Sequence, residues 1–248
     1  MTGESTHPAQ VPGIFTPEES GRIASRVNEL KEHWITRKDG SLHTLGTAAY
    51  LDVPDATTAR HFGVVADSEL YGRRVAELNP LLREHFGWVY ERLATSLAAH
   101  LSAPCRYTAR CALPGFHIFS ESPDWAVQTA HVPHFDRQFA GLDWQAGEEI
   151  DFHRSISFTL AVKLPVEGGG LKTWEVDYYQ VMAMPMDERK EFIRSQKLTL
   201  HPYQVGGWVC HSGNALHQIA PWHCHPGDQR ITLQGHGLFY DGAWNLYW

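Results

Sequence analysis

Three side chains in this sequence could hold one metal ion together: His134, Asp136 and His217. The first two are two residues apart. Residues at i and i+2 of a β-strand point to the same face, so this spacing predicts an imidazole and a carboxylate that project together into the interior. His217 lies far downstream, where the pattern predicts a strand and a turn. Two histidines and one carboxylate on one side of a metal suit Fe(II) and leave coordination positions open.

A possible carboxylate-binding residue follows the distal histidine. Arg230 opens a segment of strand character that runs to His236. Strand alternation places Arg230, Thr232, Gln234 and His236 on one face, and a polar inward face beside a metal is typical of a binding cavity. The fork of a guanidinium binds a carboxylate through two hydrogen bonds. We therefore expect Arg230 to bind a carboxylate, and Thr232, Gln234 and His236 to contact substrate.

Four further residues are weaker candidates. Lys163 is a second choice for binding a carboxylate, in case Arg230 does not. His131 would contact substrate only if Pro133 bends the strand, because alternation otherwise points it away from His134. Arg137 could meet an acidic group at the rim or be a solvated charge. Trp244 could cover the pocket or pack against the sheets.

A competing metal cluster is His223-Cys224-His225, whose two histidines would share one face of a strand and could suit zinc. Pro221, Pro226 and Gly227 surround it, so a loop is the better interpretation.

The ordered set His134-x-Asp136, His217 and Arg230 resembles the Fe(II)/2-oxoglutarate-dependent oxygenases. The resemblance covers about residues 105–240, the jelly-roll region of that family. It implies that His134, Asp136 and His217 bind Fe(II), that Arg230 pairs with the distal carboxylate of 2-oxoglutarate, and that O₂ completes the reaction. Succinate and CO₂ would be the co-products.

The segment from His131 to Asp136 also resembles the subgroup that contains free-amino-acid halogenases and their hydroxylating relatives. In the halogenases a Gly replaces the Asp and leaves a coordination site for chloride. The position here is Asp136, so the resemblance implies hydroxylation of an unactivated C–H bond. Desaturation and cyclisation stay open, as do the substrate's identity and the position of attack.

The elements that must position these residues divide the chain in two. A capping box at Thr16 and Glu19 predicts a helix from residue 16 to about residue 32. A second helix is expected from about Asn79-Pro80 to Leu101. After Pro104, short alternating segments predict strands, with one helix near Met186–Arg194 among them. The expected strands are 107–119, 128–139, 155–165, 172–176, 204–211 and 230–240.

This pattern predicts an α+β fold: a double-stranded β-helix, or jelly roll, with the N-terminal helices packed on its outer face. We expect a single oxygenase domain over residues 1–248. Residues 1–15 would be a loose arm, 16–103 a mainly helical support and 104–248 the jelly-roll core.

Composition narrows the class of partner. The net charge of −7 gives no electrostatic footprint for nucleic acid, and no apolar run is long enough for a membrane span. The four cysteines show no disulfide framework. We expect a cytoplasmic enzyme that acts on a small polar metabolite, with free amino acids as one candidate class; the pattern makes no prediction of oligomeric state.

Two alternatives stay open at this point. One is a metal enzyme that does not use 2-oxoglutarate, such as a cupin-like dioxygenase or a zinc hydrolase. The other is a non-catalytic ligand-binding sandwich domain whose histidines are incidental.

Overall fold

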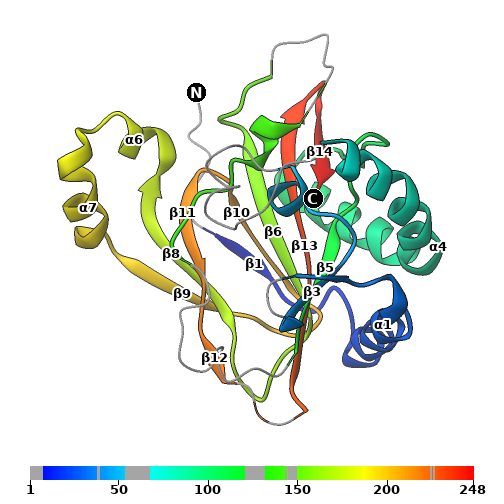
Figure 1. The fold of residues 1–248 in the computed structure, drawn as a ribbon. Helices are drawn as coiled ribbons and strands as arrows, with labels where there is room; N and C mark the ends of the chain where they lie inside the picture. Colours follow the sequence, from blue (N-terminus) through cyan, green and yellow to red (C-terminus); the bar gives the residue numbers. More distant parts are fainter. Residues whose placement is uncertain are drawn as a thin grey trace.

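The computed structural model describes residues 8–37, 40–53, 68–120, 132–142, 144, 150–223, 225 and 227–248. Helices and largely antiparallel strands are combined in it, so the expected mixed class is confirmed (Figure 1). None of the helices in the described ranges has the length and the apolar run needed to span a bilayer.

Helix α1 (Pro17–Glu29) begins where the capping box predicts. The hydroxyl of Thr16 accepts a hydrogen bond from the backbone N–H of Glu19, and the Glu19 carboxylate accepts one from the backbone N–H of Thr16. Pro17 has no N–H, so this helix start leaves three N–H groups unpaired, and two of them are thus satisfied locally. The prediction of this helix is confirmed, and it ends three residues earlier than expected.

Helix α4 (Ser68–Leu101) starts well before the expected Asn79, and Pro80 lies inside it. Proline has no N–H to donate within a helix, which explains why the sequence favours a start at that point. Both halves of α4 bury apolar side chains, Val75 in one cluster and Leu93 in another. Packing therefore outweighs the cost of the internal proline, and the non-helical backbone of Phe86 marks a kink.

The larger sheet has nine strands among the described residues. Seven follow one another in space: β1 (Ala9–Val11), β10 (Trp208–Ser212), β6 (Ser155–Lys163), β13 (Gln229–Tyr240), β5 (Gly115–Ser120), β3 (Leu42–Leu45) and β2 (Ile35–Thr36). Strand β14 (Ala243–Tyr247) pairs with β13, and β4 (Cys105–Tyr107) runs parallel to β14. We call this the major sheet.

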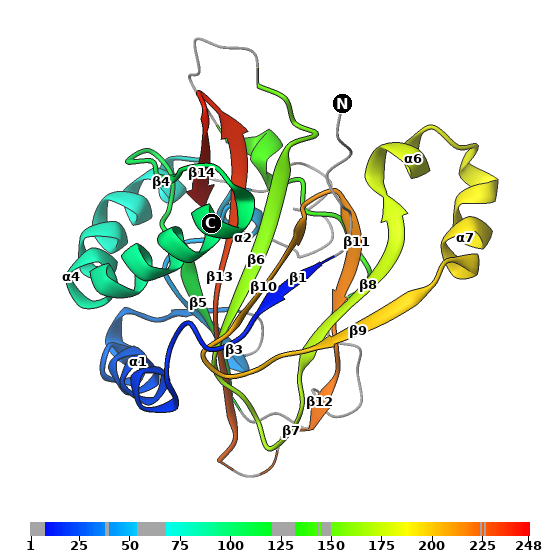
Figure 2. The ribbon, with the colours of Figure 1, turned by 180° about the vertical axis from the view of Figure 1, so that it is seen from behind.

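A smaller sheet has the order β11 (Ala215–Ile219), β8 (Gly170–Asp177) and β9 (Leu198–Pro202). We call it the minor sheet. A separate pair, β7 (Glu167–Gly168) and β12 (Trp222–His223), continues beside it. Helices α6 (Tyr178–Met182) and α7 (Met186–Ser195) connect β8 to β9, on the side of the molecule opposite to α1 and α4 (Figures 1 and 2). The short helix α2 (Ala49–Asp52) precedes α4.

The two faces of the major sheet differ in character. From β6, Ile156, Phe158 and Leu160 join the main core cluster together with side chains of α1 and α4. Burying each such side chain contributes about 1.5–3 kcal/mol, so this outward face supplies much of the stability. The alternate residues, such as Ser157 and Ala161, face the other way, and Ala161 packs with Leu171 of the minor sheet. The two sheets therefore face each other, an arrangement consistent with the expected jelly roll.

Several expected boundaries were wrong. Residues 107–119 form parts of two strands, β4 and β5, because the turn at 108–114 separates them. Residues 132–137 form no regular strand, and 128–131 lie outside the described residues. The expected loose arm contributes β1, which pairs with β10, and the expected helical support contributes β2 and β3 to the major sheet. Edge pairing of this kind depends on distant strands and leaves little trace in local sequence.

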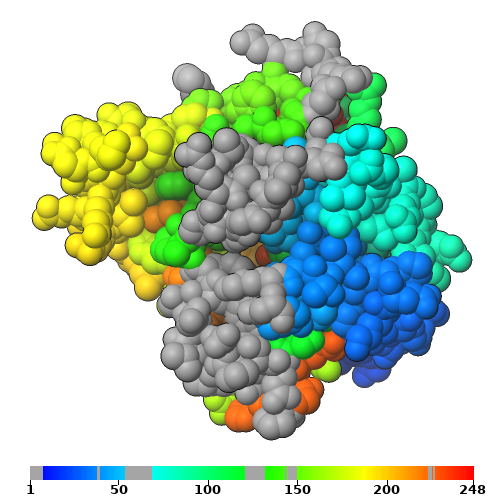
Figure 3. Space-filling model, in the orientation of Figure 1, coloured from blue at the N-terminus to red at the C-terminus, as the bar shows by residue number. Residues whose placement is uncertain are grey.

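The surface view shows the same division (Figure 3). Side chains of α1 and α4, in blue and cyan, cover one flank, and those of α6 and α7, in yellow, form the other. The residues considered next lie between the two sheets.

Candidate functional site

The predicted metal ligands come together through backbone pairing between two distant segments. His134 donates its N–H to the carbonyl of His217 at 2.9 Å, and His217 donates back at 3.0 Å. Asp136 donates its N–H to the carbonyl of Gly213 at 3.0 Å. Residues 134–136 therefore run beside β11 as a short irregular edge of the minor sheet. Pairing across the fold, rather than a regular strand, gives His134 and Asp136 their common direction.

One ligand atom from each of His134, Asp136 and His217 lies within 4.8 Å of the others. The His217 Nε2 atom is 3.3 Å from Asp136 Oδ2, and His134 Nε2 is 3.9 Å from Asp136 Oδ1. Among the described residues, this is the one group of three histidine, cysteine or acidic side chains spaced to hold a metal ion. The donor set of two imidazoles and one carboxylate suits Fe(II) with open positions.

Backbone carbonyls fix which nitrogen of each histidine faces the site. His134 Nδ1 lies 2.9 Å from the carbonyl oxygen of Val132, and His217 Nδ1 lies 3.0 Å from that of Ala215. A carbonyl can only accept, so both Nδ1 atoms carry the proton and both Nε2 lone pairs are available to a metal. The two ligands are thus held in the metal-binding tautomer.

The electrostatics keep the carboxylate ionised. Burial alone would raise the pKa of Asp136, but the neighbouring His217, His236 and His134 outweigh burial and hold that pKa well below its ordinary value. In turn, Asp136 overcomes the effect of burial on His217 and raises the pKa of that imidazole. A metal binds the neutral form of this imidazole, so the raised pKa predicts that metal affinity falls as pH falls.

A third imidazole lies beside His217. The rings of His211 and His217 are 4.3 Å apart, and His211 Nδ1 donates to the carbonyl of Ser212 at 2.8 Å. Burial, and next the proximity of His217, lowers the pKa of His211 to about 3, so His211 stays neutral. Sequence reasoning missed this residue; the signal was its inward position on an alternating strand.

Arg230 is buried at the start of β13, with only 1% of its surface exposed. Its guanidinium lies 4.9 Å from the ring of Phe119, 4.9 Å from that of Trp222 and 5.6 Å from that of Tyr203. All three guanidinium nitrogens are buried with no hydrogen-bond partner among the described residues. Burial lowers the pKa of Arg230, an effect that Tyr203 opposes.

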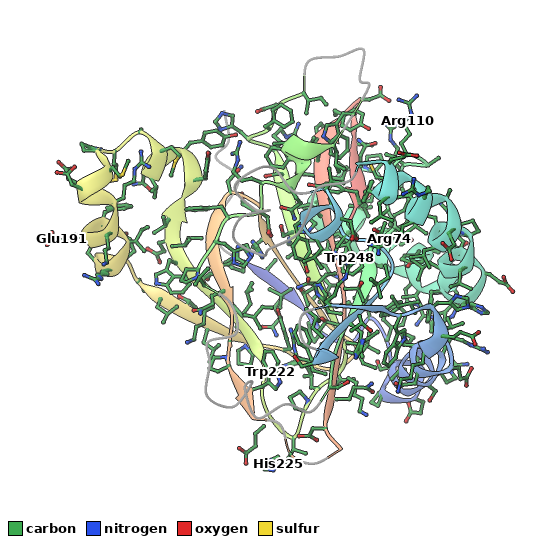
Figure 4. All side chains as sticks on the ribbon, viewed as in Figure 1. Arg74, Arg110, Glu191, Trp222, His225 and Trp248 are labelled. Atoms are coloured by element: carbon green, nitrogen blue, oxygen red, sulfur yellow. The ribbon has the colours of Figure 1, made fainter. Side chains whose placement is uncertain are left out.

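Two hydroxyl groups near Arg230 are also buried without a hydrogen-bond partner in the described part of the chain. One belongs to Thr232, two residues along the same face of β13, and the other to Tyr203. Buried donors of this kind normally cost free energy unless they are paired. Together they form a cradle suited to a carboxylate, with Trp222 as part of its wall at the lower end of the molecule in Figure 4. Tyr203 and Trp222 were not anticipated from the sequence.

The other two predicted residues of β13 lie further along the same face. The Gln234 side chain donates to Thr159 Oγ1 at 3.2 Å. His236 lies against Ser157 and is 3.7 Å from Asp136 Oδ2. The expected inward row of Arg230, Thr232, Gln234 and His236 therefore runs from the carboxylate cradle to the predicted metal ligands.

The structure places two other candidates, Lys163 and Trp244, away from the triad. Lys163 is exposed at the end of β6, where its Nζ contacts Gln229 at 3.5 Å. Trp244 is buried in the main core beside Phe239, on the helix-covered face of the major sheet. Neither placement favours contact with a ligand.

Arg137 lies 3.9 Å above the ring of Tyr178 in α6, and one of its nitrogens is buried without a hydrogen-bond partner among the described residues. Phe135 also contacts Tyr178, so Phe135 and Arg137 share a side opposite to His134 and Asp136. His131 lies outside the described residues. His225 is exposed on the loop after β12, and among the described residues it joins no metal-binding group.

A separate cavity of about 760 Å³ lies between α4 and the segments 109–111 and 141–142. Its described lining contains none of the candidate site residues. The chemistry therefore concentrates between the sheets and not in this cavity.

No protein-family model matches the sequence, and no curated protein matches it either. Solved structures do resemble it. An N-substituted L-amino acid dioxygenase from Burkholderia ambifaria AMMD is 12% identical, with a TM-score of 0.52 over 91% of each chain. The non-haem alpha-ketoglutarate-dependent epimerase SnoN from nogalamycin biosynthesis is 14% identical, with a TM-score of 0.52 over 92% of this chain and 76% of its own.

A third similar structure is AviO1 from Streptomyces viridochromogenes Tue57, at 13% identity and a TM-score of 0.51 over 95% of this chain and 90% of its own. At such low identities the similarity concerns the backbone. This chain therefore shares the fold of these proteins.

Proposed function

We propose that this protein is an Fe(II)- and 2-oxoglutarate-dependent oxygenase, with His134, Asp136 and His217 as the metal ligands. The observation that carries the proposal is Arg230: a buried guanidinium without a hydrogen-bond partner among the described residues, on a strand that leads to the triad. An uncompensated buried charge costs about 3–5 kcal/mol, so a protein gains from such an arrangement when an anionic ligand binds there.

The two ends of β13 would bind different groups, 2-oxoglutarate at one end and iron at the other. At one end, Arg230, Thr232 and Tyr203 would hold the distal carboxylate of 2-oxoglutarate, and the rings of Phe119 and Trp222 exclude water from that contact. At the other end, the two Nε2 atoms and the Asp136 carboxylate would hold the iron. When bound, the iron supplies the activation of O₂ that couples decarboxylation of 2-oxoglutarate to substrate oxidation.

We further propose hydroxylation of a C–H bond in a small polar metabolite, with a free amino acid as the leading class. The polar inward faces of β6 and β13 support a polar substrate, and Asp136 occupies the position that would otherwise be open to a halide. Proteins of this fold include an amino acid dioxygenase and an epimerase, so the fold alone leaves the outcome of oxidation open.

Two measurements on the anaerobic protein test the proposal. Addition of Fe(II) and then 2-oxoglutarate should produce a weak visible charge-transfer band, and this band should be absent in His134→Ala. A folded protein that binds Fe(II) without giving the band would favour a cupin-like enzyme or a zinc hydrolase. Unchanged metal content in His134→Ala would favour a non-catalytic binding module.

The substrate class is tested by admitting O₂ to the reconstituted protein with each of the twenty amino acids and related metabolites. We expect one group of substrates to raise succinate formation well above the uncoupled rate, with a product heavier by one oxygen atom. A chlorinated product at high chloride would contradict the role assigned to Asp136.

A further inference from the structure

A chain of hydrogen bonds leads from Gln138 to the carboxylate of Asp136. Ser157 Oγ lies 2.6 Å from Asp136 Oδ2 and 3.0 Å from His236 Nδ1. On the far side of the imidazole, the side-chain nitrogen of Gln138 contacts His236 Nε2. Gln138, His236, Ser157 and Asp136 are thus connected one to the next by contacts between their side chains.

The chemistry of the groups gives the chain one direction. The amide nitrogen of Gln138 can only donate, so His236 Nε2 accepts and His236 Nδ1 carries the proton. That Nδ1–H donates to Ser157 Oγ, and the single hydroxyl proton of Ser157 donates to the ionised Asp136.

The chain connects the two sheets. Ser157 in β6 and His236 in β13 are paired residues of the major sheet, whereas Asp136 belongs to the segment that pairs with the minor sheet. Both Ser157, at 4% exposure, and His236, at 7%, are shielded from water. A hydrogen bond to a charged acceptor in such surroundings is stronger than one in water.

We propose that Ser157, His236 and Gln138 are positioning residues for the third metal ligand. They hold the Asp136 carboxylate in its ligating orientation before a metal arrives, so metal affinity depends on them although none of the three is a ligand. His236, expected from the sequence to contact substrate, is thereby assigned to the support of Asp136. This inference rests on the metal site of the proposed function.

The chain offers a matched pair of serines for the test. Ser155 and Ser157 lie two residues apart on the same face of β6, and each is 4% exposed. The hydroxyl of Ser155 has no hydrogen-bond partner among the described residues, whereas that of Ser157 binds Asp136. Replacement of either by Ala removes one buried hydroxyl, but only Ser157→Ala breaks the chain.

Cobalt(II) binding to the full-length protein, followed anaerobically by its visible absorption, measures the effect without requiring turnover. We expect Ser157→Ala to bind Co(II) about 10- to 100-fold more weakly than the wild type, the range seen when such supporting contacts are removed. Ser155→Ala should stay within about twofold of the wild type, because its hydroxyl makes no hydrogen bond to a described residue. Ser157→Thr, which keeps the hydroxyl, should recover most of the affinity. Equal weakening in Ser155→Ala and Ser157→Ala would overturn the inference.

A second readout examines the direction of the chain. In the Zn(II)-loaded protein, nitrogen NMR should show His236 protonated on Nδ1 and bare on Nε2. Protonation on Nε2 would overturn the assignment. A wild-type protein that binds neither Co(II) nor Zn(II) would instead contradict the proposed function itself, so the two failures are distinguishable.

Discussion

The inward row on β13 runs from Arg230 to His236, and the polar groups at its two ends differ in whether they have hydrogen-bond partners. At the metal end, Asp136 accepts a hydrogen bond from Ser157, and His134 and His217 each donate to a backbone carbonyl. At the other end, the guanidinium of Arg230 has no hydrogen-bond partner within the described residues.

The difference shows which parts of the site are built before a ligand arrives. A metal centre needs its ligands oriented in advance, because its geometry must be met by several side chains at once. A carboxylate cradle can stay unpaired at a cost in stability, which the bound anion then offsets. The two ends should therefore respond in opposite ways to substitution.

The largest effect is expected at the metal end. Asp136→Ala removes the charged ligand and leaves His217 without its counter-charge, so stoichiometric Fe(II) binding should be lost. Metal content after anaerobic reconstitution, measured by elemental analysis, checks this. Retention of bound iron at wild-type affinity would show that the triad is not the binding site.

At the cradle end, Arg230→Leu should weaken 2-oxoglutarate binding by about 30-fold or more, which corresponds to about 2 kcal/mol. The same substitution should leave the ligand-free protein as stable as the wild type or more so, because it removes an uncompensated buried charge. Calorimetric titration and denaturant unfolding measure the two effects. Lys163→Met, which removes the exposed cation of β6, is the matched control and should change neither.

A loss of several kcal/mol of stability in ligand-free Arg230→Leu would contradict the comparison. It would mean that the guanidinium has a structural partner and is already satisfied without 2-oxoglutarate.

The neutral imidazoles behind the metal end predict a pH dependence of stability. The pKa is lowered to about 3 for His211 and about 4 for His236, whereas both groups titrate near 6.5 when unfolded. Between pH 6.5 and about 4 the unfolded chain therefore binds more protons than the native one, and the free energy of unfolding falls as pH falls. The pKa of His217 is raised, so its contribution has the opposite sign and is confined to pH values near and above 6.5.

Denaturant unfolding of metal-free protein at several pH values tests this. His211→Phe should reduce the slope by about 1.4 kcal/mol per pH unit, the value for one proton. Well above pH 7, His211 is neutral in both the native and the unfolded state. The difference in slope between variant and wild type should therefore vanish there. Parallel curves down to pH 4 would show that His211 is not held neutral.

The smallest effect is expected from Thr232→Val, which removes one uncharged hydroxyl from the cradle. A neutral hydrogen bond contributes about 0.5–1.5 kcal/mol, so 2-oxoglutarate affinity should fall by about 2- to 12-fold. A fall as large as that of Arg230→Leu would assign the main role in the cradle to the hydroxyl. No change would remove Thr232 from it.

The sequence predicted the elements that are marked by short-range patterns, such as a helix cap or the alternation of a strand. The capping box at Thr16 and Glu19 marked the start of α1 correctly, and the alternation in β6 and β13 was read almost to the residue. Proline misled the prediction in α4, where tertiary packing accepts Pro80 inside the helix.

The site divides in the same way. His134, Asp136, His217 and Arg230 could be proposed from residue type and order, because metal ligation and carboxylate binding each demand particular side chains. Their neighbours could not. Ser157, Gln138 and Tyr203 carry no distinctive motif, and their roles depend on which strand lies opposite.

By itself, then, the sequence determined which groups are able to ligate a metal and bind a carboxylate, since those abilities belong to the side chains. Only the tertiary structure decided which of those groups meet. Lys163 and Trp244 have suitable chemistry, but Lys163 lies at an exposed strand end. Trp244 lies in the main core. His236 has suitable chemistry for substrate but meets Ser157, because β6 and β13 are paired in that register. Strand register, set by packing over the whole sheet, is a property that no single segment of sequence contains.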